Sequence, residues 1–420
     1  MNILFLTDNF PPEVNASASR TFEHCREWVR AGHSVTVVTC APNFPNGKVF
    51  PGYANRVWQS EDIDGIHVIR LWTYITANEG FLRRSLDYSS FMAAAVLAAP
   101  FLRRADIVVA TSPHIFTACA GWAVAGMKRV PFVFELRDLW PASIKAVGAM
   151  RNERMLRRLE QLELFLYRRA SVIVSVTHSF RRDLISRAIP AEKIEVITNG
   201  VDARGFYPRE KDPELVARYG LAGKFVAGYL GTLGMAHALE TLLSAAERLQ
   251  SNPTAPDVAI LIIGEGAEKI CLLAEAKRRR LKNVTFIDAV PKAEVARYWS
   301  LLDASIIHLK KTELFTTVIP SKLFEAMATG VPVLLGVKGE AAEIVARHDV
   351  GIAFEPEDAA MLAEQIVRLA HDRELCSSLA AAGPRAARYY DRTVLAAKML
   401  SVLEATAAEA VGERRVRDIP

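Results

Sequence analysis

The feature that most constrains this fold is an alternation of short, continuously apolar segments with helical segments. In the first half we expect strands at residues 3–7, 35–39, 66–70, 107–111, 132–136, 172–176 and 194–197. Helical stretches alternate with them at 20–31, 85–102, 115–127, 151–169 and 178–188. Apolar strands separated by helices predict a parallel sheet that is covered on both faces.

The same alternation restarts in the second half. Strands are expected at 225–230, 259–264, 284–287, 304–308 and 331–335, and helices at 239–250, 267–281, 292–302, 321–329, 340–347 and 359–371. The turn Asn199-Gly200-Val201-Asp202 marks the boundary. We predict an α/β fold of two Rossmann-like, doubly wound domains facing a central cleft, at 1–200 and 201–390. A helix and tail at 391–420 would cross back to the first domain, and 420 residues suit this plan.

The positive charge of the chain lies in its first half. The net charge is +5, and residues 1–200 hold 24 Lys and Arg against 18 Asp and Glu. A basic half suggests contact with something anionic, such as membrane phospholipid, a lipid pyrophosphate or nucleic acid. A simple surplus of surface arginines is the alternative.

The five cysteines are odd in number and widely spaced, which favours reduced thiols in a cytosolic compartment. The first residues carry no basic leader before Asp8. The longest apolar run, 91–102, has 12 residues, whereas a spanning helix needs about 20. We therefore expect a cytoplasmic protein, with peripheral contact to the inner face of the cytoplasmic membrane as a further expectation.

The segment Pro320-Ser321-Lys322-Leu323-Phe324-Glu325 is the strongest candidate for ligand binding. Pro320 suits a first helical turn, where backbone amides favour an anion, and Lys322 adds a full charge beside Ser321. Glu325 lies about one turn further on, where a carboxylate suits the two hydroxyls of a ribose. The alternative is a capped surface helix with an ion pair.

Two loops that follow strands are weaker candidates for phosphate binding. The segment 10–19 has small or polar residues from Asn15 onward, although Ser17 or Ser19 could simply cap a helix. In the segment 228–234, Gly231 and Gly234 would let a pyrophosphate approach closely.

Arg137 and Asp138 follow the strand at 132–136, at the end that faces the predicted cleft. They could hold an acceptor hydroxyl or a phosphate, with Asp138 as a base, or form a structural ion pair. His114 also follows a strand, and a structural role is the more common one for a single histidine.

Two helical stretches suggest a membrane surface. The basic-apolar segments 81–84 and 101–104 bracket an apolar helix, and six arginines decorate the helix at 151–169. Basic amphipathic helices can lie in a membrane interface. A solvated polar face over a core stripe explains the pattern equally well.

Several segments together resemble a known family. They are 10–13, 41–45, 81–84, 110–113, 132–141, 199–202 and 319–330. The chain is similar to retaining glycosyltransferases of family 4, with the GT-B fold, and among them to the WbuB-like branch of bacterial O-antigen and capsule assembly. The match runs over nearly the whole chain.

The resemblance implies transfer of a hexosyl or N-acetylhexosaminyl group from a nucleotide-sugar, often a UDP-sugar, to a lipid-linked or saccharide acceptor. This would belong to lipopolysaccharide, O-antigen or capsule synthesis. The first domain would bind the acceptor and the second the donor. No metal or other cofactor is implied, because cations and helix termini meet the phosphate charge. Glu325 would bind the donor ribose, and the backbone at Val290 would meet the base.

The chain departs from the family pattern at several positions. Thr317 stands at the first glutamate of a Glu-x7-Glu motif that ends at Glu325. Thr232 and His237 stand at the phosphate-binding Arg and Lys, which leaves Lys322 as the best remaining cation, helped by His237. Arg137 stands at the catalytic-region His of many members.

Two alternatives from other functional classes stay open at this point. A nucleotide-sugar epimerase can use a similar cleft, and Thr232 and Thr317 would suit a non-catalytic donor-binding protein of a polysaccharide assembly complex. Nucleic-acid binding is not expected, because the basic residues lack interleaved aromatics.

Overall fold

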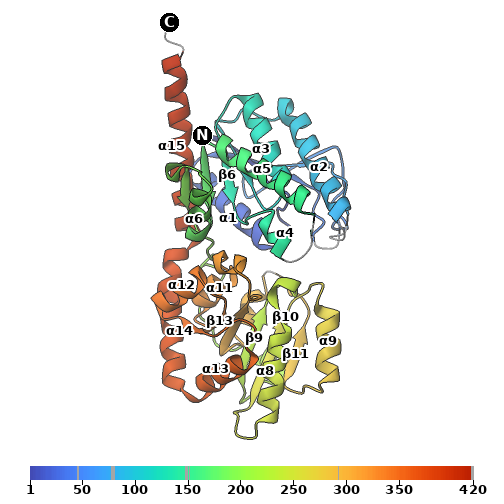
Figure 1. Ribbon diagram of the computed structural model, residues 1–420, viewed down its shortest axis with the longest axis vertical. Coiled ribbons are helices and arrows are strands. Elements are labelled where there is room, and N and C mark those ends of the chain that lie inside the picture. The colour runs from blue at the N-terminus through green and yellow to red at the C-terminus, as the bar shows by residue number, and fades with distance from the viewer. Residues whose placement is uncertain (45–46, 77–80, 147–149, 151, 292, 418–420) are drawn as a thin grey trace. The chain divides into compact units, whose positions relative to one another are not determined.

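The computed structural model describes residues 1–44, 47–76, 81–146, 150, 152–291 and 293–417. The chain forms two compact units (Figure 1). Unit 1 is Met1–Thr198 with Arg392–Pro420, and unit 2 is Asn199–Asp391. The boundaries expected from the sequence were after residues 200 and 390.

Unit 1 is built on a sheet with the strand order β3-β4-β2-β1-β5-β6-β7-β8 among the described residues. Its strands are β1 (Asn2–Leu6), β2 (Ser34–Cys40), β3 (Trp58–Ile63), β4 (Ile66–Leu71), β5 (Ile107–Thr111), β6 (Phe132–Leu136), β7 (Val172–Ser175) and β8 (Ile194–Val196). All neighbours are parallel except β3 and β4. The central strands are fully buried, which explains their continuous apolar sequence.

The edge strand β3 was not predicted. Its sequence is polar and its residues alternate between exposed and half-buried, so it lacks the apolar run of the other strands. The signal for it is the turn that follows, because Asp64 and Gly65 both have positive φ, 53° and 80°. Asp-Gly with this geometry favours a two-residue hairpin, and β3 pairs antiparallel with β4 across it.

Helices cover the sheet of unit 1. They are α1 (Ala16–Arg30), α2 (Phe81–Ala98), α3 (Ile115–Lys128), α4 (Ala142–Ala146), α5 (Glu153–Arg169) and α6 (His178–Ser186), with short 3-10 turns η1 (Ala99–Phe101) and η2 (Ala191–Lys193). The rings of Trp122 on α3 and Phe165 on α5 meet at 5.1 Å, and Phe134 on β6 meets Tyr167 on α5 at 5.0 Å. These contacts fix α3 and α5 together against the sheet.

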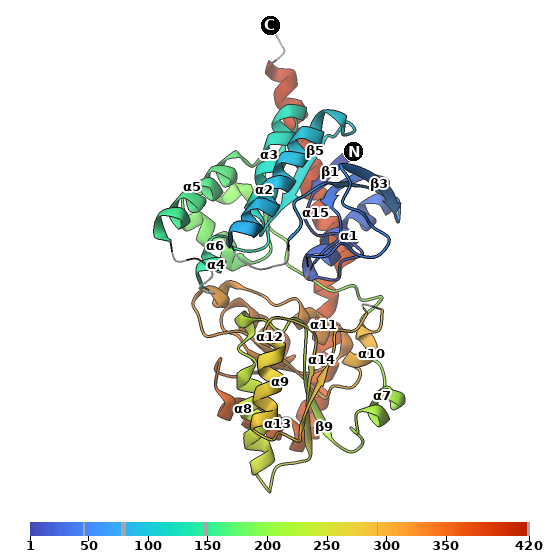
Figure 2. The same ribbon diagram turned by 90° about the vertical axis from the view of Figure 1, so that its right-hand side faces the viewer.

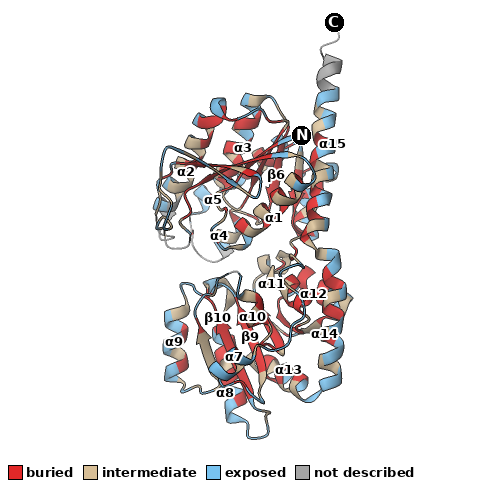
Figure 3. Ribbon diagram, turned by 180° about the vertical axis from the view of Figure 1, so that it is seen from behind, coloured by how far each residue is buried: buried red, intermediate tan, exposed pale blue. Residues whose placement is uncertain are grey.

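The long C-terminal helix α15 (Arg392–Arg417) belongs to unit 1. Leu395, Met399 and Leu403 are buried in the core formed with β1, β2 and α1. The indole Nε1 of Trp28 on α1 donates to the carbonyl of Ala396 at 2.9 Å. The buried face of α15 is visible in Figure 3 as a red stripe.

Unit 2 contains a second parallel sheet, with the order β11-β10-β9-β12-β13-β14. Its strands are β9 (Phe225–Leu230), β10 (Val258–Ile263), β11 (Val284–Ile287), β12 (Ala304–His308), β13 (Val333–Gly336) and β14 (Gly351–Ala353). Alternate residues of β9 and β10 enter two separate cores, one on each face of the sheet. The predicted doubly wound α/β architecture is confirmed in each unit.

The helices of unit 2 divide between these two cores (Figure 2). Helices α8 (Glu240–Ser251), α9 (Lys269–Arg278) and α13 (Ala359–His371) line one core, and α7 (Pro213–Arg218), α10 (Val295–Trp299), α11 (Lys322–Thr329) and α12 (Glu340–His348) line the other. Helix α14 (Arg373–Ala387) contributes to both, and the short 3-10 turns are η3 (Met235–His237), η4 (Leu314–Thr317) and η5 (Arg388–Tyr390).

Helix α14 was missed because Pro384 lies inside it, and proline ordinarily ends a helical pattern. The preceding Gly383 explains why the helix lies here. A Cβ on Gly383 would approach the carbonyl oxygen of Met327 on α11 to 2.6 Å. The close crossing of α11 and α14 therefore depends on this glycine.

Candidate functional site

In unit 2, the turns after β9 and β10 pack directly against each other. The amide of Gly231 donates to Ile263 at 2.9 Å, and the amide of Leu233 donates to Glu265 at 2.8 Å. A Cβ on Gly264 would lie only 1.9 Å from the carbonyl oxygen of Gly231. Gly264 is therefore required for packing, a role that the sequence did not reveal.

Gly231 makes room for the side chain of Lys322. A Cβ on Gly231, whose φ is +140°, would lie 2.9 Å from Nζ of Lys322. This Nζ lies 3.6 Å from the centroid of the buried Tyr229 ring, an arrangement that attracts a cation to the ring face. The Tyr229 hydroxyl donates to the carbonyl of Thr232 at 2.7 Å, which fixes the ring.

The ammonium of Lys322 is buried without a hydrogen-bond partner among the residues that the structure describes. Burial lowers its pKa from the ordinary 10.5 to about 7, although the nearby Glu325 carboxylate acts in the opposite direction. An ammonium has three hydrogens to donate and is costly to bury alone. Its position at the carboxyl end of β9 is where anions bind in such sheets.

His237 lies beside this lysine and is neutral. Burial and the Lys322 charge lower the pKa of His237 to about 3. Its Nδ1 lies 3.3 Å from the carbonyl of His308 and, facing an acceptor, must be the donor. The expectation that His237 helps Lys322 as a cation is wrong for neutral pH, because a pKa of about 3 leaves its ring uncharged.

The remaining donor-binding candidates lie nearby along the chain. Ser321 directly precedes α11 and its side chain makes no capping bond. Glu325 lies in the first turn of α11. The hydroxyl of Thr317 donates to Leu314 within η4 at 2.6 Å, and Val290 packs against the core after β11.

The structure brings four of the predicted donor-binding residues together around one aromatic ring. Gly231, His237 and Lys322 meet around Tyr229, and the ring centroids of Tyr229 and His237 are 5.6 Å apart. Gly234 precedes η3 and lies against His237. Tyr229 was missed because an aromatic inside a buried strand is ordinarily a core residue.

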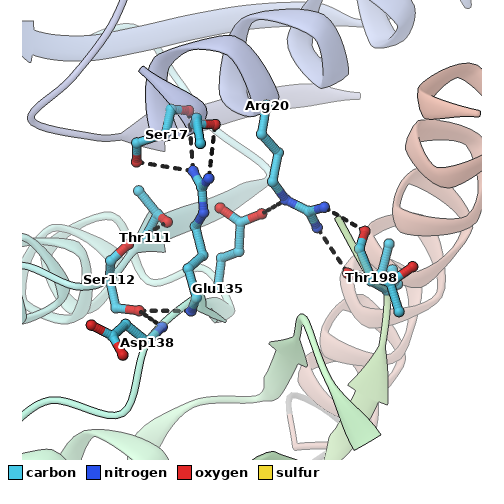
Figure 4. A network of polar contacts seen from close by, with 10 residues as sticks. Ser17, Arg20, Thr111, Ser112, Glu135, Asp138 and Thr198 are labelled. Carbon is cyan, nitrogen blue, oxygen red and sulfur yellow. Dashed lines mark hydrogen bonds and ion pairs between the residues drawn. The ribbon is translucent and has the colours of Figure 1, made fainter. Parts of the chain in front are cut away.

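In unit 1, a buried ion pair organises the carboxyl end of β6 (Figure 4). Arg20 Nε and Glu135 Oε1 are 2.8 Å apart, and both side chains are 1% exposed. The guanidinium of Arg20 also donates to the carbonyls of Ile197 and Thr198, at 3.0 and 2.6 Å. Glu135 keeps a lowered pKa: burial would raise it, but Arg20 and Arg137 outweigh that effect.

Arg137 is bonded to the start of α1 and not to Asp138. Its guanidinium donates to the carbonyls of Ala16 and Ser17 at 2.9 and 3.1 Å and to Oγ of Ser17 at 2.9 Å. Burial lowers its pKa to about 10, which leaves it charged. The alternative of a structural pair between Arg137 and Asp138 is therefore wrong, and Arg137 holds the first residues of α1.

Asp138 occupies the same strand end. Its amide and that of Arg137 both donate to Oγ of Ser112, at 3.3 and 2.8 Å (Figure 4). Burial raises the pKa of Asp138, and a hydrogen bond from Ser143 lowers it in part. A raised pKa makes the Asp138 carboxylate a stronger base than an ordinary aspartate.

Asn15 caps α1, which begins earlier than expected and with a different cap from Ser17 or Ser19. The Asn15 side-chain oxygen accepts from the amide of Ala18 at 2.8 Å, and its amide donates to Asn9 at 2.9 Å. Asn15 also lines a cavity of about 370 Å³ inside unit 1. Asp8 and Glu13, two carboxylates that also line this cavity, were not predicted as site residues from the sequence.

Of the two helices considered for a membrane surface, α5 has its apolar side chains in the core of unit 1. On α5, Leu156, Leu166 and Tyr167 are buried, so its apolar stripe is a core stripe under an arginine-rich exposed face. The side chains of Phe81, Leu82 and Arg84 lie outside the described residues. No helix in the described ranges is long and apolar enough to cross a membrane.

The five cysteines are free thiols. Within the part of the chain that the structure describes, no three His, Cys, Asp or Glu side chains gather in a way that could hold a metal ion.

Comparison with known families matches both halves of the chain. Residues 16–200 match the glycosyl transferase 4-like domain, and residues 212–386 match the glycosyl transferases group 1 domain. The two matches fall in unit 1 and unit 2, apart from residues at the boundary.

Individual proteins agree with these matches. WcaI of Escherichia coli K12, assigned to colanic acid biosynthesis as a glycosyl transferase, is 24% identical over 79% of this chain and 82% of its own. Sucrose-phosphate synthase of Thermosynechococcus elongatus superposes with a TM-score of 0.74, at 17% identity, over 97% of this chain and 99% of its own. HepE of Anabaena, solved with UDP and glucose, superposes with a TM-score of 0.70 at 19% identity, over 96% of this chain and 100% of its own.

Proposed function

The chain is a glycosyltransferase of the GT-B fold, built from a glycosyl transferase 4-like domain and a group 1 domain, and on that premise we propose its reaction. It transfers a sugar from a UDP-sugar to a lipid-linked or saccharide acceptor in the synthesis of a bacterial surface polysaccharide. The sugar is a hexosyl or N-acetylhexosaminyl group, and the transfer retains the anomeric configuration.

The observation that carries this proposal is the buried, unpartnered ammonium of Lys322. A donor diphosphate would supply the acceptors that this ammonium lacks. The missing side chain of Gly231 lets the Lys322 ammonium lie against the turn after β9, and Ser321 places the start of α11 next to the charge. Such fixed donors stabilise charge that develops on a leaving group.

In the reaction, the bond between the anomeric carbon and the diphosphate oxygen breaks, and the acceptor hydroxyl oxygen forms the new bond to that carbon. The hydroxyl proton must leave, and Asp138 is the proposed base because burial raises its pKa. Arg137 orients the first turn of α1, which carries Ser17. The charge of the released UDP is met by Lys322 and the start of α11, so we propose that no metal is needed.

We propose uridine as the base and Glu325 as the ribose ligand. HepE, which shares this fold, was solved with UDP and glucose, and this supports UDP as the first nucleotide to test. Glu325 lies in the first turn of α11, on the same helix as Lys322. Val290 follows β11, where backbone would meet the base. Thr232 and Gly234 would lie beside the phosphates, with the neutral His237 against Gly234.

The acceptor proposal rests on the polysaccharide role assigned to WcaI, which suggests surface glycan assembly of the O-antigen or capsule type. Such acceptors are carried on lipid at the cytoplasmic membrane face, where free thiols are stable. We place the protein in the cytoplasm on these grounds. We further propose that the chain belongs to the WbuB-like branch that its sequence resembles.

We also propose that unit 1 contacts the membrane through the turn after α2. Leu97 and Phe101 are spaced four residues apart and are 75% and 80% exposed, and Arg103 and Arg104 beside them are exposed as well. Exposed apolar side chains next to arginines suit an anionic lipid surface.

The test of the donor site is nucleotide binding followed by turnover. UDP should raise the melting temperature of the full chain, and the Lys322→Ala variant should lose at least about tenfold in UDP affinity while keeping its fold. Ser300→Ala in unit 2 is a control away from the proposed site. If Lys322→Ala bound UDP as well as the parent chain, the site assignment would be wrong.

A UDP-sugar panel with and without membrane extract then tests the reaction. Sugar incorporation into lipid-extractable material supports the transferase. Formation of an epimer without acceptor would favour an epimerase, and binding without any turnover would favour a non-catalytic donor-binding protein.

Vesicle flotation tests the membrane contact. Phe101→Glu should reduce binding to phosphatidylglycerol-containing vesicles by at least about fivefold. The matched control is Val57→Glu, since Val57 is 81% exposed elsewhere in unit 1. Equal loss in both variants would overturn the assignment to this turn.

A further inference from the structure

The cavity of about 370 Å³ in unit 1 lies where β1 and β5 end. Asp8 follows β1 and His114 follows β5, and both line it. His114 Nε2 lies 3.5 Å from Oδ2 of Asp8, and the hydroxyl of Thr117 donates to Oδ1 of Asp8 at 2.6 Å. The cavity is thus built from fixed side chains at the carboxyl edge of the sheet.

The electrostatics of this cavity are acidic. Three of its lining residues, Asp8, Glu13 and Asp87, are carboxylic acids, and neither lysine nor arginine lines it. Oε1 of Glu13 accepts from the amides of Asn43 and Phe44, both at 2.8 Å. Phosphate or carboxylate would be repelled here, because like charges in a partly buried site disfavour each other.

Two carboxylate oxygens of residues that line the cavity lack a hydrogen-bond donor, although Oδ2 of Asp8 lies 3.5 Å from Nε2 of His114. Oδ2 of Asp8 and Oε2 of Glu13 are buried without a hydrogen-bond partner among the described residues, and Glu13 is only 4% exposed. Buried polar oxygens are ordinarily satisfied. A ligand with hydroxyl groups would supply the missing donors.

Burial raises the pKa of Asp8 to about 7, and the Thr117 hydrogen bond lowers it only in part. Near neutral pH the Asp8 carboxyl therefore exchanges between a form that accepts and a form that donates. Burial also raises the pKa of Glu13, against the hydrogen bonds from Phe44 and Asn43. Both groups suit hydroxyls, which also donate and accept.

Aromatic side chains form another part of the lining. Phe44, Tyr88 and Phe91 line the cavity, and the rings of Tyr88 and His114 have centroids 4.0 Å apart. A sugar ring has hydroxyls around its edge and C–H groups on its faces, so it needs both hydrogen-bonding oxygens and apolar walls.

Resting on the proposed transferase function, we propose that this cavity binds the reacting end of the acceptor as an uncharged sugar ring. Its hydroxyls hydrogen-bond to Asp8 and Glu13, and His114 positions the Asp8 carboxyl. The acceptor terminus is thus a neutral hexose or N-acetylhexosamine, and neither a uronic acid nor a sugar phosphate. Any lipid phosphate of the acceptor lies outside this cavity.

The test is direct binding to the full chain of a panel of methyl glycosides, measured by saturation-transfer NMR and calorimetry. Neutral methyl hexosides and methyl N-acetylhexosaminides are compared with the matching methyl hexuronides and hexose 6-phosphates. At least one neutral glycoside should bind about tenfold or more tightly than its charged counterpart. A charged counterpart that binds equally or more tightly overturns the proposal.

Substitutions locate the binding. Asp8→Asn should weaken the neutral glycoside by about tenfold, the loss of one charge-assisted hydrogen bond, and leave UDP affinity within about twofold. Tyr88→Ala is a second variant in case Asp8→Asn fails to fold, and the exposed Glu192→Gln in unit 1 is the matched control. Unchanged glycoside affinity in folded Asp8→Asn and Tyr88→Ala contradicts the proposal.

Binding of UDP separates this inference from the function on which it rests. If UDP binds but no neutral glycoside of the panel does, the cavity assignment fails and the donor site stands. If neither UDP nor any UDP-sugar binds, the proposed function fails.

Discussion

The ammonium of Lys322 faces the ring of Tyr229 at 3.6 Å, and no hydrogen-bond partner satisfies it among the described residues. Burial lowers the pKa of Lys322, because the charged ammonium has lost the water that would solvate it. The free protein therefore carries an electrostatic cost at the position where a ligand would be stabilised. Stability and binding should respond to this residue in opposite directions.

Replacing Lys322 with methionine should separate these two effects. Lys322→Met keeps the length of the side chain and removes the buried charge, so the unfolding free energy at pH 7 should rise by about 1–2 kcal/mol. Transfer activity and UDP binding should be lost. Denaturant titration measures the unfolding free energy, and calorimetry measures UDP affinity. A destabilised variant would show that the ammonium of Lys322 has partners in the protein without ligand.

The pKa of about 7 for Lys322 makes UDP affinity depend on pH. A bound diphosphate needs the charged ammonium, which the free protein loses progressively above pH 7. UDP affinity should then fall by up to roughly tenfold per pH unit above this value. Lys322→Arg should flatten the profile, because arginine stays charged. A parent profile that is flat from pH 6 to 9 contradicts this prediction.

The same shift predicts how stability without ligand changes with pH. The pKa of Lys322 in the folded chain is below its ordinary 10.5, so the unfolded chain binds more protons between about pH 7 and 10.5. The contribution of Lys322 to stability should therefore rise with pH across this window. The change with pH of the difference in unfolding free energy between the parent and Lys322→Met measures it, because the variant lacks the ammonium that titrates in this window.

Glu325 should contribute to nucleoside recognition and not to phosphate recognition. Glu325→Ala should weaken UDP by about tenfold, the loss of a charge-assisted hydrogen bond to the ribose. At pH 6, where Lys322 is largely charged, inorganic pyrophosphate should bind the variant at least as well as the parent, because a nearby negative charge is gone. The control is Glu364→Ala, an exposed glutamate on α13. If Glu325→Ala weakened UDP and pyrophosphate equally, Glu325 would not act as the ribose ligand.

The buried pair of Arg20 and Glu135 should be essential for the stability of unit 1. Glu135→Gln leaves Arg20 charged in a site where both side chains are 1% exposed, at a cost of about 3 kcal/mol. The surface pair of Arg187 and Glu160, at 3.5 Å, provides the comparison. Glu160→Gln should change the unfolding free energy by less than about 1 kcal/mol. Similar values for both variants would contradict the role of burial.

Helix α15 should stabilise unit 1 through its buried stripe. Met399→Ala removes a side chain with no exposed surface and should cost about 2–5 kcal/mol. The matched substitution Val394→Ala, at a residue that is 42% exposed on the same helix, should cost less than about 1 kcal/mol. Melting curves that resolve the two units would show the loss in unit 1 alone.

Much of the fold could be predicted because buried parallel strands carry a continuous apolar sequence. The central strands β5, β6, β9 and β12 coincide with the expected ranges. The same reasoning could not find β3, whose polar sequence reflects an edge position, or α14, which contains Pro384. Both depend on tertiary neighbours that a local pattern does not contain.

For the candidate sites, the sequence indicated which residues could bind a ligand but not which side chains they contact. Lys322 was identified from its place at a helix start, whereas its contact with Tyr229 depends on the pairing of strands far apart in the chain. Arg137 was expected beside Asp138 but bonds to Ser17, 120 residues earlier. The carboxylates of Asp8 and Glu13 stand out only once a cavity surrounds them.

The return of α15 to unit 1 has a consequence for biosynthesis. Unit 2 is continuous in sequence, but the core of unit 1 takes Leu395, Met399 and Leu403 from beyond it. During translation, the core of unit 1 stays incomplete until all of unit 2 and then α15 have been synthesised. Until α15 is made, the apolar face of unit 1 that it covers stays exposed, and unit 2 can complete its core before unit 1 does.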